Sequence, residues 1–133
     1  MKIPKLKKKA FTIPLGIYPF TIFVCFLDLN LLMEEIKKYS NPPSEEESNK
    51  LFSELKEGSD EYGAITWNLK SGNIIIFIPK DTNSNYMVNM ITHETLHATQ
   101  MIMETIGTKL TEETDEPFCY LNGYINEQIF KQI

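Results

Sequence analysis

The chain has 133 residues, 42% of them hydrophobic, and a formal net charge of -5 at pH 7. This size and composition predict one compact domain over residues 1–133 and exclude a largely disordered chain. The acidic balance excludes general nucleic-acid binding, which needs a basic surface. Five lysines gather in residues 1–10, which we expect to form a solvated basic N-terminal arm.

An uncharged apolar stretch, residues 10–27, follows this arm in the position of a signal peptide or membrane anchor. Two prolines and a glycine between positions 14 and 19 break helical continuity, so we expect no membrane association. Cys25 and Cys119 are too few for a disulfide framework. We expect both to be reduced and half-buried, with a single disulfide left open, and the chain to be cytoplasmic in the cell that produces it.

The first half of the chain predicts one buried strand and two helices. An extended segment and a Pro-Gly turn lead into residues 20–27, an almost unbroken apolar run typical of a strand buried on both faces. A helix is expected over about residues 28–39, before a Pro-Pro pair. Ser44 then begins a second helix, because Glu47 three residues later completes a capping box. We expect this helix to run to about residue 57, with Gly58 as its C-terminal glycine.

The second half predicts a β-hairpin and two further helices. Residues 62–69 and 73–78 alternate or run apolar around a turn in which Gly72 supplies a positive φ. A long helix is expected from residue 83 or 84 to Gly107, and a final helix from near residue 114 through residue 129. The order of elements indicates the α+β class: a small mixed or antiparallel sheet packed against the long helix and other helices.

The long helix carries the pattern H-E-x-x-H over residues 93–97, and it holds the two histidines of the chain. Because residues four apart lie on one helical face, His93 and His97 can bind the same cation. Glu94 projects beside them, at an angle that reaches a water on the metal without ligating it. Zinc makes such a water acidic, and Glu94 can take its proton as a general base. We therefore predict a Zn²⁺ site.

A zinc site needs at least one more protein ligand, and without a third histidine it must be a carboxylate or a thiolate. Glu104 lies on the same continuous helix, too far along its axis to converge. We favour Glu116, because it opens a helix that can pack antiparallel against the long one after the turn at Gly107. The other downstream donors are Asp115 and Glu113, as next choices, followed by Glu112 and Cys119.

His93-Glu94-x-x-His97, followed nineteen positions later by Glu116, resembles the gluzincin pattern of thermolysin-like metallopeptidases. Residues 92–128 also resemble small metallopeptidase-like proteins encoded by tailed bacteriophages. The resemblance implies a minimal zincin-like domain in which His93, His97 and Glu116 bind zinc and Glu94 is the base. One turn after the glutamate ligand, where thermolysin-like enzymes have an aspartate, this chain has Tyr120. Support for the histidines is then expected from Asp115 or a backbone carbonyl.

Two further expectations concern the substrate. Tyr120 and Tyr124 lie one turn apart on the side of the final helix that carries Glu116, and either phenol can stabilise an oxyanion. We select Tyr124 as a catalytic candidate beside Glu94, against the alternative of a core tyrosine with a wet hydroxyl. As in zincins, the strand over residues 73–78 is expected to bind an extended peptide by edge addition.

These features favour a zinc-dependent peptide hydrolase that acts on a protein or peptide partner. The alternative is a zincin-fold structural or interaction protein, for example a phage virion component, in which zinc only stabilises a small core. A third alternative is a regulatory protease domain that cleaves repressors. The expected partners are thus a peptide substrate or virion assembly partners, with no nucleic acid and no membrane.

Overall fold

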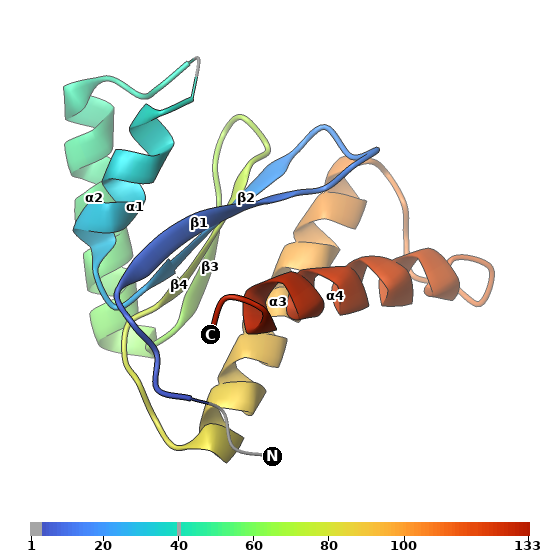
Figure 1. Cartoon of the computed structure of the whole chain (residues 1–133). Helices are drawn as coiled ribbons and strands as arrows, with labels where there is room; N and C mark the ends of the chain where they lie inside the picture. Colours follow the sequence, from blue (N-terminus) through green and yellow to red (C-terminus); the bar gives the residue numbers. More distant parts are fainter. Residues whose placement is uncertain (1–3, 40) are drawn as a thin grey trace.

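The computed structural model describes residues 4–39 and 41–133, which form three layers: a four-stranded mixed sheet with helices on both faces (Figure 1). The strand order is β1-β2-β4-β3. Helices α1 and α2 cover one face, while α3 and α4 cover the other. The predicted α+β class with a small mixed sheet is confirmed.

The first two strands, β1 (Lys9–Pro14) and β2 (Thr21–Phe26), form an antiparallel hairpin. Strand β2 is buried on both faces, as its unbroken apolar run predicts. The lysines of the basic arm that the structure describes are exposed, as expected for a solvated arm, but the arm is attached to the fold at Leu6. Leu6 is only 6% exposed and donates its backbone N–H to the Asp81 carboxylate at 3.3 Å, and β1 begins at the last lysine of the arm. Of the arm's lysines, Lys2 lies outside the described residues.

The helices α1 (Leu29–Lys37) and α2 (Glu45–Tyr62) begin close to the predicted positions. Asp28 caps the first, and Ser44 caps the second as predicted. The Ser44 hydroxyl accepts a hydrogen bond from the Glu47 N–H, which satisfies one of the free donors of the first turn. The predicted end of α2 is wrong: the helix continues through Gly58 and ends at Gly63, whose φ is 84°. A glycine is tolerated inside a helix, whereas the conformation at position 63 is one that favours glycine.

The predicted hairpin is confirmed as β3 (Ile65–Asn68) and β4 (Ile74–Ile78). Gly72 has a φ of 91° and donates its N–H to the Leu69 carbonyl at 2.9 Å, which closes the turn. Strand β4 also pairs in parallel with β2 on its other side. The expectation that residues 73–78 form a peptide-binding edge is therefore wrong. The edge strand of this hairpin is β3.

The long helix α3 (Ser84–Thr105) begins after Asn83, whose side-chain oxygen accepts from the Tyr86 N–H at 3.0 Å. It ends at Gly107 as predicted: the Thr108 N–H bonds back to the Met103 carbonyl at 2.9 Å. Helix α4 (Asp115–Phe130) then crosses over α3 (Figure 1). Within residues 4–39 and 41–133, none of the helices has the length and apolar character needed to cross a membrane.

Alternation along the strands divides the core into two clusters. The cluster under α1 and α2 contains Phe23, Cys25, Ile75 and Phe77 from the sheet. The larger one, under α3 and α4, contains from the sheet Ile13, Ile22, Val24, Phe26, Ile74, Ile76 and Ile78. Both cysteines are free; Cys25 is buried as a small hydrophobe, but Cys119 is exposed rather than half-buried.

Candidate metal centre

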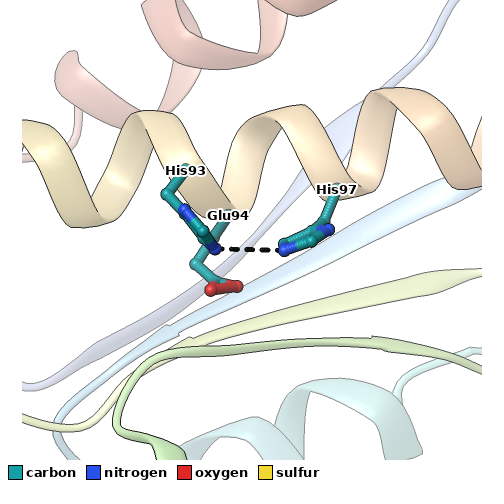
Figure 2. A group of neighbouring side chains, drawn as sticks. All are labelled: His93, Glu94 and His97. Atoms are coloured by element: carbon teal, nitrogen blue, oxygen red, sulfur yellow. Dashed lines mark hydrogen bonds between the residues drawn. The ribbon is translucent and has the colours of Figure 1, made fainter.

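His93 and His97 project from one face of α3, and their rings point toward each other over one helical turn (Figure 2). Both side chains are exposed, and their Nε2 atoms lie 3.1 Å apart. Two nitrogens bound at 2.0–2.1 Å to one tetrahedral zinc ion would lie about 3.3 Å apart. The pair thus already has nearly the separation that a shared ion requires.

Glu94 lies beside this pair and, unlike the histidines, is only 5% exposed. One ligand atom of each of His93, Glu94 and His97 lies within 4.8 Å of the others, and the described residues bring no further acid or thiol into this group. The predicted convergence of the three residues is confirmed. The two imidazole nitrogens are ligands that zinc and other divalent transition metals accept, and the Glu94 carboxylate lies beside them.

Thr66 in β3, on the strand that faces α3, holds the Glu94 side chain through a hydrogen bond. Its hydroxyl donates to Oε2 of Glu94 at 2.7 Å and lies 3.1 Å from the backbone oxygen of the same residue. Sequence reasoning missed this residue. The available signal was its place between Ile65 and Trp67 in a strand, because alternation turns the polar side chain away from the face that carries the two apolar ones.

The three residues open onto a cleft of about 860 Å³ that runs between α3, β3, the end of α2 and residues 79–82. Tyr62 and Tyr86 are exposed and also line the cleft. Met90 and Met101 line it as well, and they reach the core only partly. An open cleft with apolar walls and a few convergent polar groups is typical of a ligand site.

Glu116 is not brought to the histidines. It is exposed in the first turn of α4 and lies outside the group of converging ligand atoms. The reason is the side of α3 on which α4 packs. The Thr99 hydroxyl bonds to the Asn122 side chain of α4 at 3.2 Å, and Thr99 points about 200° around the helix from His97, two residues earlier. Figure 2 shows the histidines directed toward the sheet.

The other downstream candidates also lie outside this group. Tyr124 donates its hydroxyl to the Pro14 carbonyl at 2.7 Å and is not among the residues that line the cleft. Tyr120 is 75% exposed on the same outer face of α4. The acids and the thiol that were the other ligand candidates are all exposed: Glu112, Glu113, Asp115 and Cys119.

Comparison of the chain with protein-family models, with curated proteins and with solved structures found no match.

Proposed function

We propose that this protein is a zinc-dependent peptide hydrolase in which His93 and His97 bind the metal and Glu94 is the general base. The observation that carries the proposal is the 3.1 Å approach of two imidazole nitrogens beside a buried carboxylate, where all three side chains line an open cleft. Both histidines lie on α3 and face the cleft, where water and substrate can reach a bound ion. Catalytic zinc sites have three protein ligands, so the proposal requires one ligand besides His93 and His97, and this ligand is not among the converging atoms of the described residues.

Each residue has a definite task in this reaction. A zinc ion held by His93 and His97 would supply an acidic water molecule and polarise the carbonyl group of the scissile bond. Glu94 accepts the proton of the attacking water and delivers it to the amine that leaves. The low exposure of Glu94 keeps bulk water from reorienting its carboxylate, so the base is held ready for the proton.

The free edge of β3 is suited to bind the peptide. The Leu69 N–H donates to the Asn73 carbonyl, so this pair is hydrogen-bonded, and the register makes Trp67–Ile75 and Ile65–Phe77 the next bonded pairs. The backbone groups of Thr66 therefore point away from β4, toward the free edge. An extended peptide that adds to this edge lies along the cleft and passes Glu94.

The arrangement disfavours the structural alternative. A structural zinc stabilises a small fold by joining separate segments of the chain. Here the histidines lie four residues apart on one helix, so these two ligands by themselves join no two elements. The resemblance to phage-encoded proteins, virion partners and the cleavage of repressors stay predictions from the sequence alone.

The test combines zinc content with hydrolysis of a defined peptide mixture, followed by mass spectrometry. The wild type should hold about one zinc per chain and cleave peptides, and His93→Ala should lose both. Glu94→Gln should keep the zinc and lose turnover by about 100-fold or more, because the amide cannot accept the proton. Glu104→Gln, exposed on the same helix and outside the cleft, is the matched control and should match the wild type. A wild type without zinc, or a fully active Glu94→Gln, overturns the proposal.

A further inference from the structure

The carboxylate of Glu94 is held by a strand rather than by its own helix. A side chain as buried as this one needs a hydrogen-bond partner, because an unpaired carboxylate removed from water is costly. The partner is the hydroxyl of Thr66, 28 positions earlier in the chain and at the outer edge of the sheet. Helix α3 supplies the base, and β3 supplies the group that holds it.

The contact has the geometry of a charge-assisted hydrogen bond. Oxygens of a hydroxyl and a carboxylate that share a proton lie about 2.5–2.7 Å apart, and Thr66 Oγ1 lies 2.7 Å from Glu94 Oε2. The backbone oxygen of Glu94 is farther away, at 3.1 Å, so the carboxylate is the closer of the two acceptors of the hydroxyl proton. Threonine is branched at Cβ and stiff at χ1, which fixes the direction of this bond in the strand.

We propose that Thr66 is a positioning residue for the base: it binds Oε2 of Glu94 and so leaves Oε1 to take the proton of water. This inference rests on the proposed peptide hydrolysis. The backbone of the same residue faces the free edge on which the peptide is proposed to lie. Thr66 therefore fixes two positions at once, that of the base through its hydroxyl and that of the substrate through its backbone. The scissile bond and the base are aligned by one residue of β3.

A first experiment needs neither metal nor activity. In the metal-free protein, NMR should show a Thr66 hydroxyl proton protected from exchange and a Glu94 carboxyl carbon signal that shifts in Thr66→Val. Thr66→Ser, which keeps the hydroxyl, should restore the wild-type signal. Thr12→Val makes the same change in β1, the other edge strand, where the side chain is also partly buried, and should leave the Glu94 signal in place. An unshifted Glu94 signal in Thr66→Val overturns the proposal.

A second experiment follows hydrolysis. Thr66→Val should keep the zinc affinity of the wild type and lower kcat by about 10- to 100-fold, the usual cost of a misplaced catalytic group. KM should change little, because the backbone of residue 66 stays in place. Thr66→Ser should recover most of the loss. If Thr66→Val does not fold, Thr66→Ala removes the hydroxyl without added bulk and is judged by the same results. Equal kcat values for wild type and Thr66→Val overturn the positioning role.

The two proposals fail in different ways. If the wild type neither binds zinc nor cleaves peptides, the hydrolase is overturned, and the NMR result alone decides whether Thr66 positions Glu94. If the wild type is active but the hydroxyl can be removed without loss, the hydrolase stands and the role of Thr66 is overturned.

Discussion

The hydroxyl of Tyr124 donates a hydrogen bond of 2.7 Å to the carbonyl of Pro14, which joins α4 to the end of β1 across 110 positions of the chain. The bond faces the outside of the fold, and its residues lie away from the histidines. It gives Tyr124 a structural task and withdraws its hydroxyl from the cleft.

Tyr124→Phe should therefore lower the free energy of unfolding by about 0.5–1.5 kcal/mol, the usual net value of one hydrogen bond, and leave peptide hydrolysis unchanged. Urea denaturation and the peptide assay measure the two effects. Tyr120→Phe, on the same helix and more exposed, is the control and should cost less than about 0.5 kcal/mol. A loss of turnover in Tyr124→Phe would show that the phenol acts in the cleft after all.

Glu116→Gln should keep the zinc affinity of the wild type within about twofold, because Glu116 lies outside the group of ligand atoms. Competition with a coloured chelator measures the affinity, with His97→Ala as the variant that should lose binding. A tenfold or greater loss in Glu116→Gln would mean that α4 changes its packing on α3 when the metal binds.

The glycine inside α2, Gly58, and the glycine that follows its last residue, Gly63, should respond oppositely to the same substitution. Gly63 has a φ of 84° and a ψ of -128°, a conformation that L side chains rarely adopt, so Gly63→Ala should cost about 1–3 kcal/mol. Gly58 lies inside the helix, and a Cβ there would meet Ile65 Cδ1 at an ordinary 3.5 Å. Gly58→Ala should stabilise the fold by about 0.5–1 kcal/mol, since alanine favours the helix. Urea midpoints measure both, and destabilisation by Gly58→Ala would contradict this assignment of the helix.

The two cysteines should differ in reactivity. Burial raises the pKa of the Cys25 thiol to about 12 from an ordinary 9.0, whereas Cys119 is exposed. Native protein should therefore show one fast thiol toward an alkylating reagent and a second only on unfolding.

Between pH 9.0 and about 12 the unfolded chain loses the Cys25 proton and the folded chain keeps it, so the stability that Cys25 contributes falls as pH rises.

Unfolding at about pH 8 and about pH 10.5 tests this sign: the decline should be smaller in Cys25→Ala than in the wild type. An equal decline would assign the pH dependence to other groups.

Local sequence patterns predicted most of the helices and strands, but they did not predict which strands pair. Ser44, Asn83 and Gly107 marked helix ends because the atoms that they satisfy lie within a few residues. The end of α2 was misjudged because two glycines stood in reach, and the polar residues between them continue the helix. The pairing of β2 with β4 joins segments about fifty positions apart, so nothing local showed that β4 is interior and β3 the edge.

The candidate site divides in the same way. His93, Glu94 and His97 share one helix, so their spacing alone brought them together. The prediction that Glu116 is a ligand depended on how α4 packs. That packing is set by buried residues such as Leu121 and Ile125, which direct the helix across α3. The position of Thr66 beside Glu94 depends on the order of the strands in the sheet, and the sequence alone did not determine which strand lies beside α3.

The location of both histidines on one helix has a consequence for assembly of the protein. An i,i+4 pair forms as soon as one turn of helix exists, so a nascent or partly unfolded chain already presents the two histidines that are proposed to bind zinc. Zinc that binds the unfolded chain gives the native fold correspondingly less stabilisation. If the protein binds zinc as proposed, metal loading can precede completion of the sheet, and the pairing of β3, with Thr66, would then orient the proposed base on a helix that already holds the metal.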